Sequence, residues 1–435
     1  MKRILSTITA LALCVCAFAG SYDKTLRLDY IFSGTDKTAE ISLARMHSID
    51  GWFGRSVNMD KLLLRGNGQI RLNDKATGKL LYVNSFSTLF QEWQNEEEAT
   101  RVRKSFENVF LVPMPDAPAT VTVELTDNYN KVVASITHDV DPADILISPV
   151  EEAYPSRYLL KSGASEDCID IAFVAEGYRA EEAELFFSEA KMAMESILSH
   201  EPFKSMKDRF NFVAVAAPSL ESGTSVPHDH AWKNTVLGSH YDTFYMERYL
   251  TTLNLFKLHD VLSSVPYEHI IILCNTETYG GGGIFNSYML SSTRHSLSKP
   301  VIVHEFGHSF AGLGDEYFYD DEFVQTYNNV VEPWEPNITT LVDFDSKWKD
   351  MMEIDGIVTK ADQAAERAAG RDTRKMDYTK ADFKVGLYEG AGYMSEGAYR
   401  PYPECRMKIN EYPVFCPVCE RAIRTIIDYY TVEDR

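Results

Sequence analysis

The spacing of apolar residues divides the chain into a first part rich in short strands and a second part in which strands and helices alternate. The clearest β-rich runs of the first part are 26–30, 80–83 and 120–125. Turn residues at Asp127–Asn130 follow the last of these runs and predict a hairpin. One helix is expected, at about Glu96 to Phe106. We therefore predict an all-β, sandwich-like domain for residues 20–143.

From Cys168 onward, buried strand patterns alternate with amphipathic helix patterns. The predicted strands are 169–175, 210–217 and 270–275, and the predicted helices are 181–198, 253–262 and 361–369. A glycine run, Gly280–Gly283, precedes a further predicted strand at 284–291. This alternation predicts a mixed α/β domain over residues 158–435. The segment 141–158 contains three prolines among acidic residues, so we predict a linker at 144–157.

The composition narrows the class of protein. The chain has 435 residues, of which 45% are hydrophobic and 25% charged, as in an ordinary globular protein. Its formal net charge of −21 argues against a nucleic-acid partner, because phosphate binding requires a basic face.

The amino terminus has the pattern of an export signal. Lys2 and Arg3 precede a short apolar run, and Ala17-Phe18-Ala19 forms a small-residue cleavage motif before Gly20. We expect residues 1–19 to be removed and the protein to be secreted, periplasmic or on the cell surface. The apolar run is shorter than the ~20 residues of a membrane span, and no later run is long enough.

Five cysteines remain after the expected cleavage. They are Cys168, Cys274, Cys405, Cys416 and Cys419. The first two lie at or inside predicted strands and are read as small buried hydrophobic residues. Two of the last three could form a disulfide in an oxidising compartment. A zinc knuckle is the weaker reading of their C-x2-C motif, because no second pair and no nearby histidine accompanies it.

The sharpest chemical motif is His304-Glu305-Phe306-Gly307-His308. Residues four positions apart lie on one face of a helix, so His304 and His308 can present their imidazoles to a single zinc ion. Glu305 lies beside them, where it can reach water at the metal without acting as a ligand. Such a carboxylate can take the proton of that water as it attacks a carbonyl.

A catalytic zinc site needs a third protein ligand. Gly312 is a plausible end of the helix and would turn the chain so that Asp315 approaches the metal. Glu316 is the rival third ligand.

This region resembles the metzincin peptidases, although Gly312 stands one position later than their H-E-x-x-H-x-x-G pattern requires. The string HEFGHSFAGLGDEY is more specifically similar to the M64 metallopeptidases, known as the IgA peptidase family. Supporting segments are 173–178, 219–223, 279–281, 389–393, 399–401, 405–407 and 415–419. The resemblance implies a β-rich amino-terminal domain followed by a secreted zinc endopeptidase with two histidines and an aspartate on the metal. Its substrates would be proteins or peptides, with host glycoproteins such as immunoglobulin as one option.

The resemblance also suggests roles for residues around the metal. Met407 is the candidate for a methionine that packs beneath the ligands, and Met394 is the alternative. Tyr317, Tyr393 and Tyr399 are candidates for a hydroxyl that stabilises the oxyanion. The expected substrate-binding residues are Tyr279, Gly280, Gly281 and Tyr393, because an edge strand after the glycine run could bind an extended peptide.

Two other functions would use the same residues differently. A zinc amidase or deacetylase acting on a non-peptide substrate needs the same metal, water and glutamate. A surface binding protein would rely on the β domain and keep a residual metal site. The triplet His228-Asp229-His230 ranks lower as a metal site, and Asn337-Ile338-Thr339 is a glycosylation sequon.

Overall fold

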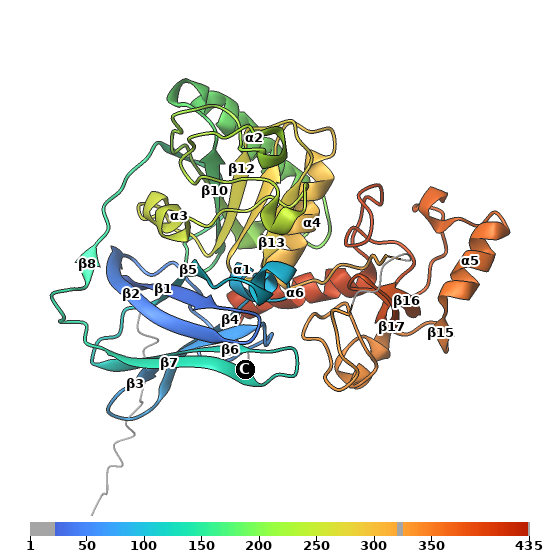
Figure 1. Cartoon of the computed structure of the whole chain (residues 1–435), viewed down its shortest axis with the longest axis horizontal. Helices are drawn as coiled ribbons and strands as arrows, with labels where there is room; N and C mark the ends of the chain where they lie inside the picture. Colours follow the sequence, from blue (N-terminus) through green and yellow to red (C-terminus); the bar gives the residue numbers. More distant parts are fainter. Residues whose placement is uncertain (1–21, 320–324, 434–435) are drawn as a thin grey trace, which may run out of the picture.

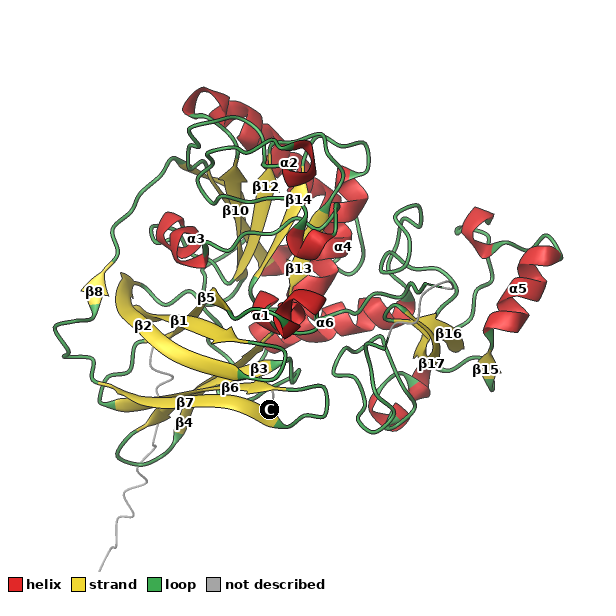
Figure 2. Ribbon diagram, in the orientation of Figure 1, coloured by secondary structure: helices red, strands yellow, loops and turns green. Residues whose placement is uncertain are grey.

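The computed structural model describes residues 22–319 and 325–433, so the predicted export signal lies outside the described residues. The first domain consists of two four-stranded sheets (Figures 1 and 2). One sheet has the order β5 (Lys104–Pro113), β1 (Lys24–Gly34), β2 (Ala39–Asp50) and β8 (Ser148–Pro149). The other has the order β4 (Leu80–Phe86), β3 (Gly68–Asp74), β6 (Ala119–Thr126) and β7 (Val132–Val140). Neighbouring strands are antiparallel except for β2 and β8.

Alternating apolar residues of both sheets form the core of this N-terminal domain. Leu28 and Tyr30 of β1 and Val121 and Val123 of β6 are fully buried in one cluster. The hairpin predicted at Asp127–Asn130 is confirmed, since it joins β6 to β7.

The helix predicted at about Glu96 to Phe106 is wrong. The structure has α1 (Leu89–Trp93), a 3-10 turn (Glu97–Thr100) and then β5, which starts at Lys104. The acidic run at 96–98 supplies good helix formers, but they form only one turn. Phe106 and Val112 are buried because β5 pairs with β1 along its whole length. Tertiary pairing therefore overrides the local helix preference.

The second domain is built on a six-stranded sheet. Its order is β13 (Gly281–Ile284), β14 (Tyr288–Ser292), β12 (His269–Cys274), β10 (Ile169–Glu176), β11 (Phe210–Val215) and β9 (Ser156–Lys161). The four inner strands are parallel and the two edge strands are antiparallel to their neighbours. The strand predicted at 284–291 is instead the β13–β14 hairpin, and the glycines themselves form its first strand.

Helices cover the two faces of this sheet differently. Ile171 and Phe173 of β10 pack in the same cluster as Phe306 of α4 (Ser298–Ala311) and residues of α2 (Ala183–Ile197) and α6 (Pro417–Thr431). Ala172 on the opposite face joins the cluster that contains α3 (Leu255–Val261) and the core of the N-terminal domain. The prediction of a β-rich domain followed by a mixed α/β domain is confirmed.

A smaller lobe projects to the side of the α/β domain (Figure 1). It contains β15 (Ile357–Val358), α5 (Lys360–Ala368), β16 (Leu387–Ala391) and β17 (Met394–Arg400). Helix α6 runs from this lobe back to the N-terminal domain, where Asn58 donates hydrogen bonds to the carbonyls of Tyr429 and Val432. Within the described residues, no helix is both long and apolar enough to cross a membrane.

A candidate metal centre on helix α4

Helix α4 carries the two histidines of the motif on one face. His304 and His308 lie one turn apart, and their side chains are partly exposed. Ile302, Phe306 and Phe310 are fully buried in the core of the domain. The helix is therefore anchored on its apolar side, while the two imidazoles stay partly exposed.

A left-handed turn ends α4 and brings a carboxylate back to the histidines. Gly312 has φ of +60°, which glycine adopts without strain, and its N–H donates to the carbonyl of His308. After this turn, Asp315 Oδ1 lies 3.0 Å from Nε2 of His304 and 3.2 Å from Nε2 of His308. The two Nε2 atoms are 3.0 Å apart.

Hydrogen bonds on the far side of each ring determine which nitrogen is free. Nδ1 of His304 lies 3.0 Å from the carbonyl oxygen of Arg406, and Nδ1 of His308 lies 2.6 Å from that of Leu313. A carbonyl oxygen can only accept, so each Nδ1 carries a proton and each neutral ring has a lone pair on Nε2. The two Nε2 atoms and Asp315 Oδ1 then place their lone pairs close together.

This donor set fits a divalent cation. The buried Asp315 Oδ1 has no hydrogen-bond partner. Two nitrogens on a tetrahedral zinc, with Zn–N of about 2.0–2.1 Å, would lie about 3.3 Å apart, close to the distances observed. Two imidazoles and one carboxylate are also the donors of known catalytic zinc sites.

The charges of His308 and Asp315 depend on each other. Burial opposes a charged His308, but the carboxylate of Asp315 outweighs burial and raises the pKa of His308 to about 9. Burial would likewise raise the pKa of Asp315, yet His308 and His304 hold it well below its usual range. With the imidazoles neutral, a cation would supply the charge that balances Asp315.

Glu305 lies beside the cluster and belongs to the same helix. A Cβ atom at Gly281 would lie 2.9 Å from Glu305 Oε1, and one at Gly283 would lie 2.5 Å from the Glu305 carbonyl oxygen. Glycine is therefore required for β13 to pack this closely against α4. Burial raises the pKa of Glu305 above its usual range, so its carboxylate binds a proton more readily than an exposed glutamate does.

Met407 packs against the ligand helix from below. A Cβ atom at Gly307 would lie 2.6 Å from Met407 Sδ, so the methionine fills the space that this glycine leaves open. Met407 is fully buried. Met394 lies in a separate small cluster with Ile338, Ala391 and Ala398.

The predicted tyrosines occupy different positions. The hydroxyl of Tyr393 donates to Asp315 Oδ2, the carboxylate oxygen that faces away from the histidines. Tyr317 packs edge-on against Tyr393. The hydroxyl of Tyr279 accepts a hydrogen bond from Asn410. Tyr399 lies on β17, where its backbone pairs with Thr339.

The outer edge of β13 is partly covered. The N–H of Leu250 donates to the carbonyl of Gly281, and Tyr249 forms an isolated parallel bridge with the same glycine. Gly280 lies against the carbonyl of Arg248. The glycine run therefore does form an edge strand of the sheet, and Gly281 on this strand already has one backbone partner.

Glu316, the rival third ligand, faces away from the histidines. Its Oε1 accepts a hydrogen bond from Asn337 and lies 3.1 Å from Cys419 Sγ. Within the described residues, two groups of side chains could hold a metal ion. These groups are His304, His308 and Asp315, and Glu316, Cys405, Cys416 and Cys419. His228 pairs with Asp242 instead.

Asn337 holds the turn that carries both carboxylates. Its side chain accepts the N–H of Gly314 at 2.7 Å, donates to the carbonyl of Gly314 at 2.9 Å, and donates to Glu316 Oε1 at 3.0 Å. It is fully buried, so the sequon at this position is not accessible for glycosylation in the folded chain. Its sequence context points only to the sequon and gives no sign of this positioning role.

The N-terminal domain reaches this region through α1. Glu92 on α1 accepts a hydrogen bond from the hydroxyl of Tyr249, next to the glycine strand. Burial raises the pKa of Glu92 to about 7, and His308 and Glu305 are among the charges that act on it. No motif in the sequence marks Glu92.

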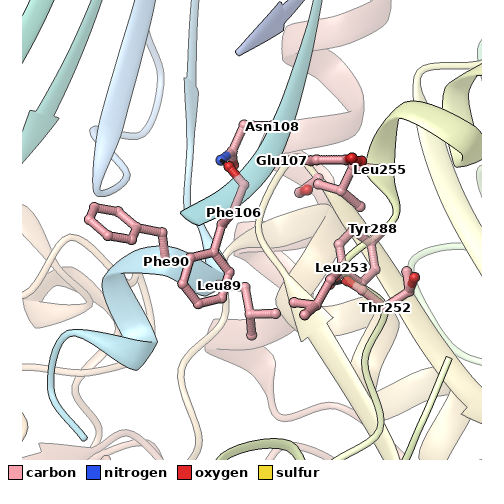
Figure 3. A pocket seen from close by; sticks show the side chains of 10 residues that line it. Leu89, Phe90, Phe106, Glu107, Asn108, Thr252, Leu253, Leu255 and Tyr288 are labelled. Atoms are coloured by element: carbon pink, nitrogen blue, oxygen red, sulfur yellow. Dashed lines mark hydrogen bonds between the residues drawn. The ribbon is translucent and has the colours of Figure 1, made fainter. Parts of the chain in front are cut away.

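A small pocket lies where the two domains meet (Figure 3). Its lining residues are Leu89, Phe90, Phe106, Glu107, Asn108, Thr252, Leu253, Leu255, Ser287 and Tyr288. Glu107 accepts the backbone N–H of Phe256 across this boundary. The pocket contains none of the candidate metal ligands and is a feature of the domain interface.

Comparison with known families covers both domains. The family model described as IgA Peptidase M64 matches residues 158–375 and 357–427, which together span more than half of the chain. The model described as Peptidase M64 N-terminus matches residues 18–137. No curated protein matches the sequence.

Proposed function

Because the chain belongs to the IgA peptidase M64 family and is a metallopeptidase, we propose that it is an exported zinc endopeptidase in which Glu305 is the general base. The observation that carries this proposal is the convergence of two lone-pair nitrogens and an unpartnered carboxylate oxygen within 3.0–3.2 Å. Its substrates are polypeptides.

His304, His308 and Asp315 would hold the metal. Zinc would fit these donors best, because two imidazoles and one carboxylate suit its borderline character and the two histidines are partly exposed. When bound, zinc supplies a Lewis acid that polarises the peptide carbonyl and lowers the pKa of water.

Glu305 moves the proton. Its carboxylate takes a proton from the attacking water and delivers it to the nitrogen of the departing amine, which is the ordinary sequence of general base and general acid catalysis. Burial raises the pKa of Glu305, which makes its carboxylate a stronger base toward the attacking water. The packing of Gly281 and Gly283 fixes the position of Glu305.

Tyr393 holds the third ligand in place. Its hydroxyl donates to Asp315 Oδ2 and leaves Oδ1 directed at the histidines. A partner of this kind orients a metal ligand and tunes its basicity. We assign the substrate-contacting wall to Tyr279, Gly280 and Gly281, since this segment leads into the strand that packs on Glu305.

The decisive experiment compares the full chain with Glu305→Gln. Both proteins are incubated with a mixture of denatured polypeptides, and new amino termini are counted by mass spectrometry. We expect Glu305→Gln to keep its metal and its fold while cleavage falls by about 10²–10⁴-fold. Glu411→Gln, an exposed glutamate on another segment, is the matched control and should cleave normally. Full cleavage by Glu305→Gln would contradict the proposal.

Export is a separate part of the proposal and has its own test. The amino-terminal sequence of the protein recovered outside the cytoplasm should begin at Gly20, after the Ala17-Phe18-Ala19 motif. Recovery of the chain only inside the cytoplasm, with Met1 and the apolar run still attached, would contradict export and leave the peptidase proposal standing.

A further inference from the structure

We propose that Glu316, Cys405, Cys416 and Cys419 form a second metal site, a structural zinc site that holds the catalytic ligands in position. The four side chains come from three separate segments of the chain. Glu316 follows the third catalytic ligand directly, Cys405 lies just before Met407, and the other two cysteines lie at the start of α6. This second site rests on observations that do not depend on the peptidase chemistry proposed above.

The distances match tetrahedral coordination. The four ligand atoms lie within 4.8 Å of one another. Two thiolates on a tetrahedral zinc, with Zn–S of about 2.3 Å, would be about 3.8 Å apart, and the Sγ atoms of Cys405 and Cys419 are 3.8 Å apart. A thiolate and a carboxylate oxygen would be about 3.6 Å apart. Glu316 Oε1 lies 3.1 Å from Cys419 Sγ and 3.9 Å from Cys416 Sγ.

The burial of the glutamate is the second observation. Glu316 is fully buried and its Oε2 has no hydrogen-bond partner. A buried carboxylate with an unpaired oxygen is costly unless it is paired or binds a metal. Three cysteines that served only as small apolar residues would not explain this carboxylate among them. A cation bound by the carboxylate and the thiolates does explain it.

Backbone N–H groups are directed at the sulfur atoms. Cys405 Sγ accepts from the N–H of Cys416 at 3.2 Å and of Met407 at 3.5 Å. Cys416 caps α6, and its Sγ accepts from the N–H of Cys419 at 3.5 Å. These donors favour the thiolate form that a metal requires.

A disulfide is the competing arrangement. All five cysteines within the described residues are free, and the 3.8 Å between Cys405 and Cys419 exceeds the roughly 2.05 Å of a disulfide bond. A disulfide between these two would leave the Oε2 atom of the buried Glu316 still without a hydrogen-bond partner. The tetrahedral site uses all four groups.

The site would brace the catalytic cluster through the backbone. The N–H of Glu316 donates to the carbonyl of Met407 at 2.9 Å, and the carbonyl of Arg406 accepts from His304 Nδ1. A metal bound to Glu316 and Cys405 therefore fixes the segment that carries Asp315 to the segment that orients His304. Loss of this metal should loosen the catalytic ligands without removing any of them.

The test measures metal content and spectra of the full chain. Purified protein should bind two zinc ions per chain, and the double variant Cys416→Ser, Cys419→Ser should bind one. The double variant His304→Ala, His308→Ala should also bind one. After replacement of zinc by cobalt, the histidine variant should keep the near-ultraviolet thiolate-to-cobalt charge-transfer band, and the cysteine variant should lack it. Cys168→Ser is the matched control and should keep both ions and the band.

Peptide mapping with thiol alkylation separates the two arrangements. Denatured, chelator-treated wild-type protein should show free thiols at Cys405, Cys416 and Cys419. A disulfide between any two of these cysteines in freshly purified protein, with one zinc per chain, would overturn the proposal. One zinc per chain and no thiolate-to-cobalt band would also overturn it, even if the cysteines were reduced. If the double cysteine variant does not fold, the wild-type spectrum and the histidine variant still decide the question.

Discussion

Asp315 and Glu316 are neighbours in the sequence, but their carboxylates belong to two different clusters. Asp315 joins two histidines whose side chains are 14% and 16% exposed. Glu316 joins three cysteines that are all at most 1% exposed. A catalytic metal site keeps an open position, whereas a structural site is closed. The partly exposed histidines beside Asp315 fit a catalytic site, and the buried cysteines beside Glu316 fit a structural site.

The net charges of the two clusters support the same division into a catalytic and a structural site. Two neutral imidazoles and one carboxylate around a divalent cation leave a net charge of about +1, so the ion stays electrophilic. Three thiolates and one carboxylate give about −2, which quenches that character. Under the two proposals, a reactive site and an inert site would use the carboxylates of two adjacent residues.

The largest effect should come from removing each of the two carboxylates in turn. Asp315→Asn should lower peptide cleavage by more than about 100-fold, because a direct ligand should matter more than an outer-sphere partner. It should keep the thiolate-to-cobalt band. Glu316→Gln should weaken that band, keep the catalytic metal and reduce cleavage less. Equal loss of cleavage in both variants, with both sites emptied together, would contradict the division into two sites.

Removing the side chain that joins the two clusters should destabilise the fold. Asn337→Ala deletes three hydrogen bonds and leaves the buried polar groups of Gly314 and Glu316 without their partner. We expect the free energy of unfolding to fall by about 2 kcal/mol, measured by denaturant titration of the metal-loaded protein. Asn95→Ala, which removes an exposed hydrogen bond, should change it little. A loss no greater than that of the control would argue against this clamp.

A smaller effect is expected from the partner of Asp315. Tyr393→Phe removes the hydroxyl that donates to Asp315 Oδ2. Zinc affinity of the histidine cluster should fall by about 10-fold or somewhat more, measured by competition with a chromogenic chelator, while the thiolate-to-cobalt band stays unchanged. Tyr399→Phe is the control. Unchanged affinity in Tyr393→Phe would show that Asp315 does not depend on this contact.

The smallest effect concerns the domain boundary beside the histidine cluster. Burial raises the pKa of Glu92 to about 7 in the folded chain, above the 4.5 of an ordinary glutamate. The folded state therefore holds this proton to higher pH, and stability falls as pH rises between about 4.5 and 7.

Glu92→Gln should remove this contribution while keeping an acceptor for the hydroxyl of Tyr249. Between pH 4.5 and about 7, the free energy of unfolding should fall by about 1 kcal/mol less in Glu92→Gln than in the wild type. The expected difference is small because the side chain is partly exposed. Denaturant titrations at several pH values measure it. A parallel pH profile for both proteins would contradict the raised pKa.

Local patterns predicted much of this architecture. Strands β1, β4 and β6 were predicted from β-rich runs, whereas β2, β3 and β5 were not predicted. The i, i+4 spacing of His304 and His308 predicted the helix that carries them. The helix at about Glu96 to Phe106 failed because pairing of β5 with β1 decides that segment. The β13–β14 hairpin was missed because its glycines carry no side-chain pattern.

The second cluster could not be assembled from spacing alone. Its C-x2-C motif has no fourth ligand nearby in the sequence, because Glu316 lies far from the cysteines and directly follows a candidate ligand of the other site. One clue was available. Consecutive side chains in an extended segment point to opposite sides, so a metal-facing Asp315 implies a Glu316 that faces the interior. Asn337 and Glu92 act through tertiary contacts for which the sequence has no local signature.

The most direct test is a crystal structure of the purified full chain with diffraction data collected on both sides of the zinc absorption edge. We predict an anomalous peak within about 2.1 Å of Nε2 of His304, Nε2 of His308 and an Asp315 oxygen. A second peak should lie among the three sulfur atoms and Glu316. Absence of any cation from the histidine cluster of the zinc-loaded protein would contradict the peptidase site, and absence of the second peak alone would contradict the structural site.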